Sequence, residues 1–173
     1  MGCYQGLEAL RGAKPWFVMA AITQLEDELI QPNWRAFEWG CGGSTLWLSQ
    51  WCDSVVSLEH DREWHKQVSN DLVTYNISNV ELICADLGGP YETYIDHYEV
   101  FDLIFIDGRN RVACLGHAVR HLSPGGVLVL DNSEREQYQV AIIEHLASWE
   151  RWDHLSQGGG YAGWTTSIWQ KPR

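Results

Sequence analysis

A glycine-rich turn directly after an apolar run is the strongest candidate ligand site in this chain. Residues 36–39 have the apolar and aromatic content of a short strand. The turn that follows holds three glycines, Gly40, Gly42 and Gly43. Ser44 and Thr45 come next and favour the start of a helix, predicted at residues 45–51, whose first N–H groups face the turn. Such a turn can bind a carboxylate, a hydroxyl or a phosphate, as in a nucleotide-like ligand.

Acidic residues follow the next two predicted strands. Glu59 ends a β-branched run and lies nineteen positions after Gly40, where an acid can accept hydrogen bonds from both hydroxyls of a ribose. Asp86 follows the third predicted strand and is placed to reach an adenine amino group. The alternatives are a surface acid at Glu59 and a helix cap or loop acid at Asp86.

Polar side chains also end the two strands predicted further along. Asp107 ends the fourth strand, and Asp131 with Asn132 ends the fifth. Because ligands of open α/β sheets bind at the carboxyl ends of the strands, these three side chains are expected to converge beside the glycine turn. The alternative is that Asp107 accepts hydrogen bonds from backbone amides and that residues 131–133 cap the following helix.

Two arginines stand beside the end of the fourth strand. The guanidinium groups of Arg109 and Arg111 can hold a carboxylate or a phosphate of a substrate. They can equally pair with Asp107 and Glu134 as structural bridges, and the sequence leaves both interpretations open.

The elements that must position these residues alternate between strands and helices. Strands are expected at 36–39, 55–59, 80–85, 101–107, 127–131, 152–156 and 165–170. Helices are expected at 14–29, 45–51, 62–75, 90–97, 112–121 and 135–149, and residues 124–126 are expected to turn into the fifth strand. This alternation predicts an α/β fold with a doubly wound, mainly parallel seven-stranded sheet, helices on both faces and an antiparallel C-terminal strand pair.

Taken in order, these motifs resemble those of the class I S-adenosylmethionine-dependent methyltransferases. The matching segments are EWGCGGST at 38–45, Glu59, Asp86, FDLIFIDG at 101–108 and LSPGGVLVLDN at 122–132. The resemblance covers nearly the whole chain and implies S-adenosylmethionine as the cofactor. The residues it places around the cofactor are Glu38, Gly40, Gly42, Ser44, Thr45, Glu59, Asp86 and Asp107. Among these, Glu38 is expected to orient the methionine amino group and Glu59 to bind the ribose.

The ends of the fourth and fifth strands also resemble a metal-dependent subgroup, the catechol and caffeoyl-coenzyme A type O-methyltransferases. That resemblance implies Mg²⁺ held by Asp107, Asp131 and Asn132, which would lower the pKa of an acceptor hydroxyl. The subgroup carries a lysine three residues after its first acid, where this chain has Asn110. The interval from the first acid to the second is also shorter than in the subgroup.

The activity implied is methyl transfer to an oxygen or nitrogen nucleophile of a small molecule, with Asp107, Asp131 and Arg109 as candidate catalytic residues. Orientation and exclusion of water can supply much of the rate, on the order of 7 to 11 kcal/mol. One alternative is a nicotinamide-dependent oxidoreductase, although the last glycine of GxGxxG would fall at Thr45. The other is a non-catalytic S-adenosylmethionine-binding subunit.

Length and composition limit the organisation of the chain. The 173 residues, 45% hydrophobic, favour one methyltransferase domain over 1–173, with a helical segment at 1–30 as a candidate lid. The glycine-rich loop at 158–163 is a second candidate lid. Ten tryptophans are present, of which Trp39 and Trp164 are expected to touch ligands.

Charge and cysteine content predict the partners and the compartment. The net charge of −11 should repel a phosphate backbone, so nucleic acid is not expected as a substrate. The sequence contains no apolar run long enough to cross a membrane and no signal peptide, so no membrane partner is expected. Five scattered cysteines indicate reduced thiols in the cytoplasm. A homodimer is left open.

Overall fold

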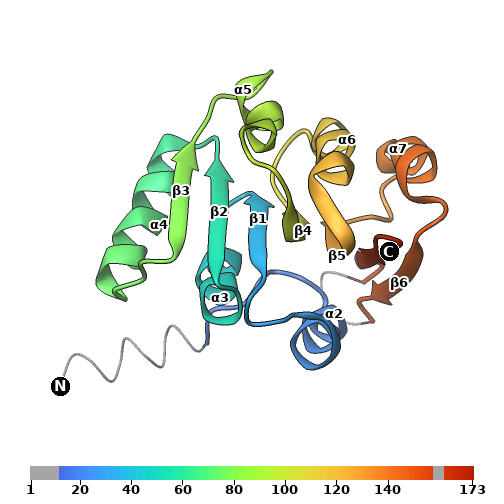
Figure 1. Cartoon of the computed structure of the whole chain (residues 1–173), viewed down its shortest axis with the longest axis horizontal. Helices are drawn as coiled ribbons and strands as arrows, with labels where there is room; N and C mark the ends of the chain where they lie inside the picture. The colour runs from blue at the N-terminus through green and yellow to red at the C-terminus, as the bar shows by residue number, and fades with distance from the viewer. Residues whose placement is uncertain (1–11, 158–161) are drawn as a thin grey trace.

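A computed structural model describes residues 12–157 and 162–173 and shows a seven-stranded sheet flanked by helices (Figure 1). The strands are β1 (Arg35–Trp39), β2 (Ser54–Glu59), β3 (Val80–Cys84), β4 (Phe101–Ile106), β5 (Leu122–Asp131), β6 (Glu150–Leu155) and β7 (Thr165–Gln170). Their order in the sheet is β3-β2-β1-β4-β5-β7-β6. The first five strands run parallel to one another, and β7 runs antiparallel to both β5 and β6. The predicted sheet is therefore confirmed.

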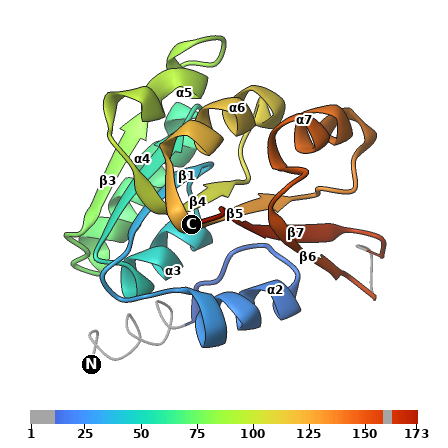
Figure 2. The same cartoon turned by 45° about the vertical axis from the view of Figure 1, so that its right-hand side comes forward.

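Helices cover both faces of the sheet. They are α2 (Met19–Gln24) with a π-helical turn (Leu25–Leu29), α3 (Gly43–Trp51), α4 (Arg62–Thr74), α5 (Pro90–Thr93) with a 3-10 helix (Tyr94–His97), α6 (Arg111–His121) and α7 (Glu136–Leu146). In Figure 2, α2 and α3 lie on one side of the sheet, and α5, α6 and α7 lie on the other. Within the described residues, no helix is long and apolar enough to span a membrane.

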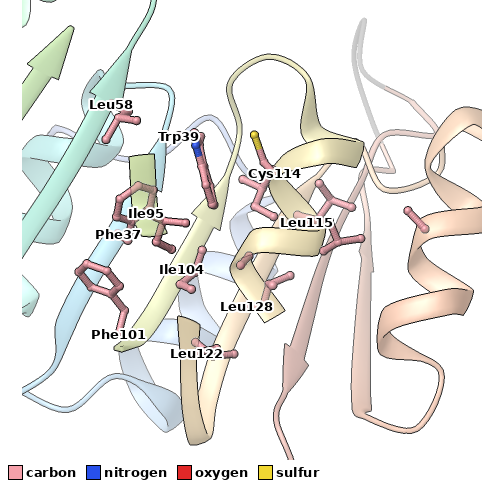
Figure 3. Packing of buried hydrophobic residues seen from close by; sticks show 14 of the residues in the cluster. Phe37, Trp39, Leu58, Ile95, Phe101, Ile104, Cys114, Leu115, Leu122 and Leu128 are labelled. Carbon is pink, nitrogen blue, oxygen red and sulfur yellow. The ribbon is translucent and has the colours of Figure 1, made fainter. Parts of the chain in front are cut away.

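The central strands are apolar on both faces because each face is covered by helices. In β4, Leu103 and Phe105 pack with the buried residues of α2 and α3, whereas Ile104 and Ile106 pack in the opposite cluster beneath α5, α6 and α7. This alternation follows from the two-residue period of a strand. Figure 3 shows Ile104 of β4 in the same buried cluster as Cys114 and Leu115 of α6.

Two predicted boundaries were each wrong by five residues. The first helix begins at Met19 rather than at residue 14. The segment before it lies along β7 instead, where the Val18 N–H donates to Thr166 Oγ1 at 3.0 Å. Strand β5 begins at Leu122 rather than at residue 127, because residues 124–126 continue the strand through an irregular register in which Gly125 has φ +79°.

The two candidate lids are described only in part, because residues 1–11 and 158–161 lie outside the described part of the chain. The described part of the first lid contains α2 and its π-helical turn.

Candidate active site

A cavity of about 590 Å³ opens at the carboxyl ends of β1, β2, β4 and β5. The chain leaves β1 toward β2 on one side and returns to β4 on the other, so the cavity lies at the point where the strand order reverses. Ligands of open α/β sheets bind at such points. Candidate residues that line it are Gly40, Gly42, Ser44, Glu59, Asp107, Arg109, Arg111, Asp131, Asn132 and Trp164.

The glycine turn between β1 and α3 is packed too closely to accept side chains at two positions. Gly40 has φ +96°, and a Cβ there would lie 2.8 Å from the backbone of Gly108 at the end of β4. A Cβ at Gly43 would lie 2.7 Å from the carbonyl oxygen of Lys14. The turn is thus fixed between β4 and the segment that precedes α2.

Glu38 lies behind this turn and does not line the cavity. Its side chain is wholly buried and accepts hydrogen bonds from Ser44 Oγ and Ser57 Oγ, both at 2.7 Å, and from Thr45 Oγ1. The hydroxyl of Thr45 also accepts the N–H of Gly42 at 2.9 Å. Burial raises the pKa of Glu38 to about 7, and the three hydroxyls oppose that shift. This network ties the turn to the start of α3 and to β2.

Glu59 lines the cavity at the end of β2 and is 5% exposed. Its Oε1 atom accepts the backbone N–H groups of His60 and Asp61, each at 2.8 Å. The Cys41 thiol lies 3.7 Å from its Oε2 atom. On the same wall the Trp64 indole donates to the carbonyl of Cys41 at 2.7 Å. Glu59 therefore presents a carboxylate of fixed orientation to the cavity.

Two residues expected to touch ligands lie elsewhere. Asp86 is outside the cavity lining, and its side chain is 74% exposed in an ion pair with Arg62 at 3.1 Å. Trp39 is wholly buried in the core, where its indole donates to the carbonyl of Tyr91 at 2.9 Å.

Arg111 bridges the ends of β4 and β5. Its Nη2 atom donates to Asp107 Oδ1 at 2.9 Å and to the Asp107 carbonyl at 2.7 Å. Its Nη1 atom donates to the Asp131 carbonyl and to Asn132 Oδ1, the latter at 3.4 Å. A further bond joins Nε to the carbonyl of Gly108 at 3.0 Å. With 10% of its side chain exposed, this arginine holds the two strand ends together.

The carboxylate of Asp131 accepts hydrogen bonds from two residues at the start of β7, the strand that pairs with β5. Thr166 Oγ1 donates to Oδ1 at 2.7 Å, and Trp164 Nε1 donates to Oδ2 at 2.9 Å. Burial raises the pKa of Asp131 to about 7, and the nearby Asp107 carboxylate adds to the shift. Burial also raises the pKa of Asp107 to about 6, although Arg111 opposes it.

These residues do not fit the predicted magnesium site. The Arg111 guanidinium stands between Asp107 and Asn132, where a cation would have to lie, and both oxygens of Asp131 already accept hydrogen bonds. Within residues 12–157 and 162–173, no group of three or more His, Cys, Asp or Glu side chains could hold a metal ion.

Arg109 lines the cavity and is exposed. In the described part of the chain its guanidinium makes no hydrogen bond or ion pair, unlike that of Arg111. Lys14, Trp16 and Trp64 also line the cavity but were not singled out from the sequence. Of these three residues, only Trp64 could have been placed near the site from the sequence. It lies three residues after the helix cap Asp61 and so in the first turn of α4.

Comparison with known proteins identifies the class of protein to which this fold and cavity belong. A family model described as a methyltransferase domain matches residues 37–133, more than half of the chain. The chain therefore belongs to this family, within the class I S-adenosylmethionine-dependent methyltransferases. The resemblance seen in the sequence is confirmed, and membership in the family decides against the nicotinamide-dependent alternative.

Individual relatives are distant. An rRNA methylase from Streptococcus thermophilus is 13% identical, with a TM-score of 0.71 over 93% of this chain and 100% of that one. A Streptococcus mutans protein solved in complex with S-adenosylhomocysteine is 15% identical, with a TM-score of 0.66 over 88% and 97% of the two chains. The carboxy-S-adenosyl-L-methionine synthase of Shewanella sp. (strain ANA-3) is 24% identical over 140 residues, 75% of this chain. This chain spans 56% of that relative's length.

The expectation that excluded nucleic acid as a substrate was wrong. It depended on the net charge of −11, yet a protein described as an rRNA methylase has the same fold over 93% of this chain. Net charge averages over the whole surface, whereas an acceptor meets only the mouth of the cavity. The lining of this cavity includes three basic side chains, Lys14, Arg109 and Arg111.

Proposed function

We propose that this protein binds S-adenosylmethionine in the cavity and transfers its methyl group to an oxygen or nitrogen nucleophile of a small molecule. The observation that carries the proposal is a meeting of three features at one edge of the sheet. They are the glycine turn, the amide-held carboxylate of Glu59, and two acids with raised pKa values, Asp107 and Asp131. Family membership supports the choice of cofactor.

The residues on the β1 and β2 side are proposed to hold the cofactor. Glu59 accepts hydrogen bonds from ribose hydroxyls, and the turn at Gly40 and Gly42 lies beneath the methionine part. Glu38 and Thr45 position that turn from behind. Bound S-adenosylmethionine supplies a methyl group on a positively charged sulfur.

The residues on the β4 and β5 side are proposed to serve the acceptor. Asp107, with a pKa of about 6, is largely ionised at neutral pH and can accept a proton from a hydroxyl or an amine. Arg111 fixes the position of its carboxylate. Asp131 positions Trp164, and Arg109 lines the same cavity. Because Arg111 takes the place of a cation, we propose that the reaction needs no divalent metal.

A second candidate function comes from the curated relative named as a carboxy-S-adenosyl-L-methionine synthase. A carboxylated cofactor would bring a negative charge into the cavity, and the exposed guanidinium of Arg109 could bind it. Mass spectrometry of the nucleoside that remains bound after purification separates the two candidates by the mass of one carboxyl group.

Calorimetric titration of the full chain with S-adenosylhomocysteine, and separately with NAD, tests the proposal. Micromolar binding of the former alone supports it, and binding of NAD instead contradicts it. Turnover is then measured with labelled S-adenosylmethionine against small hydroxyl and amine compounds, and against rRNA and tRNA. Methylation of RNA alone would assign a nucleic-acid acceptor. Tight binding without turnover on any acceptor would indicate a non-catalytic subunit.

Asp107→Asn provides the matched test of the acceptor side, because it keeps the shape of the side chain and removes its charge. We expect kcat to fall about 100-fold, the usual contribution of a positioned base.

We also propose that residues 1–173 form one methyltransferase domain. A cytoplasmic location is consistent with the free thiols of the four described cysteines, Cys41, Cys52, Cys84 and Cys114.

A further inference from the structure

A second cavity of about 530 Å³ adjoins the first and differs from it in chemistry. Its walls are the segment that leads into α2, residues 15–20, and the end of β6 with the loop after it, residues 155–157. Trp16 and Trp164 line both cavities and form the junction between them. We call this second cavity the tryptophan groove.

None of the described residues that line the tryptophan groove is charged, and Ser156 and Gln157 supply its polar side-chain groups. The first cavity, in contrast, is lined by acidic and basic side chains such as Glu59, Asp107 and Arg111. The groove also exposes apolar surface that a protein ordinarily buries, with Trp16 at 80%, Met19 at 59% and Leu155 at 55% exposure. These properties suit an uncharged, flat apolar group.

The walls of the groove are held in place by hydrogen bonds on both sides. The Ser156 N–H donates to the Trp164 carbonyl at 2.8 Å, which fixes the tryptophan across the end of β6. The Val18 N–H donates to Thr166 Oγ1 at 3.0 Å, and His154 Nε2 lies 2.7 Å from Gln24 Oε1. The groove is therefore formed before any ligand binds, as small-molecule sites usually are.

The groove is also connected to the acidic end of the first cavity. Trp164 and Thr166, which contact its two walls, both donate to the carboxylate of Asp131. Because Trp16 and Trp164 line both cavities, a ring bound beside them in the groove can extend one edge into the cavity that carries Asp107 and Asp131. A hydroxyl or amine on that edge would meet the residues assigned to the acceptor.

The geometry points to the tryptophan groove as the acceptor site, and to an uncharged planar aromatic small molecule that carries a hydroxyl or an amine as its occupant. This inference rests on the proposed methyltransferase function and adds the class of acceptor to it. A volume of about 530 Å³ accommodates two or three fused rings. Because none of the described lining residues is charged, an acceptor with a phosphate or carboxylate next to its ring is disfavoured.

The test uses 2-naphthol as an uncharged probe and 2-naphthoate as its charged counterpart, titrated calorimetrically into the full chain with and without S-adenosylhomocysteine. We expect naphthol to bind and naphthoate to bind at least roughly tenfold more weakly, because the described residues of the groove offer the carboxylate no basic partner. Absence of naphthol binding, or equal affinity for the two probes, would overturn the assignment.

Two variants place a charge in the groove at exposed positions, Met19→Glu and Leu155→Glu, and a third, Val73→Glu, places the same charge on α4 away from both cavities. Each groove variant should weaken naphthol binding roughly tenfold while the control keeps the wild-type affinity. Naphthol affinity that is unchanged in both groove variants would refute the site. Displacement of naphthol by a short RNA hairpin would instead assign the groove to a nucleobase and refute a small-molecule acceptor.

The two proposals fail separately in this design. If the wild-type chain does not bind S-adenosylhomocysteine, the proposed function is contradicted, whatever the result with naphthol. Normal S-adenosylhomocysteine binding together with any of the overturning naphthol results contradicts only the assignment of the groove.

Discussion

The two halves of the main cavity are built by different kinds of contact. On the β1 and β2 side, backbone amides and hydroxyl groups hold the carboxylates of Glu38 and Glu59. On the β4 and β5 side, one guanidinium group, that of Arg111, joins two strand ends. The first half depends on neighbours in the sequence and on a hydroxyl from the adjacent strand. The second depends on one long side chain, and so it should be the easier half to break.

The largest expected effect is therefore that of Arg111→Ala. Removal of this side chain leaves the Asp107 carboxylate and three carbonyl groups without their donor. We expect the free energy of unfolding to fall by about 3 kcal/mol, because breaking a largely buried ion pair strands the remaining charge. Urea denaturation measures this value. Arg120→Ala is the matched control on the same helix, where a 57% exposed arginine should contribute less than about 1 kcal/mol.

Equal losses for the two arginine variants would mean that Arg111 does not hold the strand ends together, and the contrast between the two halves would disappear.

The next effect concerns ligand binding on the other half. Glu59→Gln removes the charge that faces the ribose position, so the free energy of S-adenosylhomocysteine binding should become less favourable by about 1 to 3 kcal/mol. The fold should remain intact, since both amides can still bond to the side-chain carbonyl. Glu63→Gln, in the first turn of α4, serves as the control. An unchanged dissociation constant for Glu59→Gln would remove Glu59 from the cofactor site.

A third effect is a dependence of stability on pH that arises from Glu38. Its pKa is about 7 in the folded protein against 4.5 for the free side chain. The folded state thus binds the proton more tightly, and the free energy of unfolding should fall as pH rises from about 4.5 to 7, by roughly 1 kcal/mol per pH unit. Asp107 and Asp131, whose pKa values are also raised, add to the same trend.

Glu38→Gln should reduce the pH dependence of the free energy of unfolding by the contribution of this one carboxyl group. Urea denaturation at pH 5 and pH 7.5 measures the difference. A wild-type slope that survives the substitution unchanged would assign the effect to the two aspartates alone.

The contrast between the halves also explains what the sequence could and could not predict. The sheet and the turn at Gly40 were predictable because strand period, glycine content and helix-start residues act over a few neighbouring positions. Thr45 was predicted next to the cofactor, yet it lies buried against Glu38. The sequence shows that both residues are polar but not which way each side chain turns.

The β4 and β5 side was harder to predict because its contacts are long-range. The sequence suggested either substrate binding or a structural bridge for Arg111, and the bridge to Asp107 is the contact observed. Its second contact, with the Asp131 carbonyl, spans twenty positions. The hydrogen bond from Trp164 to Asp131 spans thirty-three, and it depends on how β7 pairs with β5. No local pattern encodes either contact.

The smallest expected effect follows from the same bridge and distinguishes this chain from the metal-dependent subgroup it resembles. Because the Arg111 guanidinium already neutralises Asp107 and bonds to Asn132, a divalent ion has no place between them, and exhaustive chelation should leave the rate of methyl transfer unchanged. The assay compares turnover with excess EDTA and with added Mg²⁺. Loss of turnover on chelation, with recovery by Mg²⁺, would mean that Arg111 moves aside in the working protein.

Arg111→Ala sharpens the comparison, since removal of the cation leaves oxygen atoms of Asp107 and Asn132 facing an open space, the kind of ligand set that Mg²⁺ prefers. A thermal shift on addition of Mg²⁺ in this variant, and none in the wild type, is the result expected if the arginine substitutes for a metal ion.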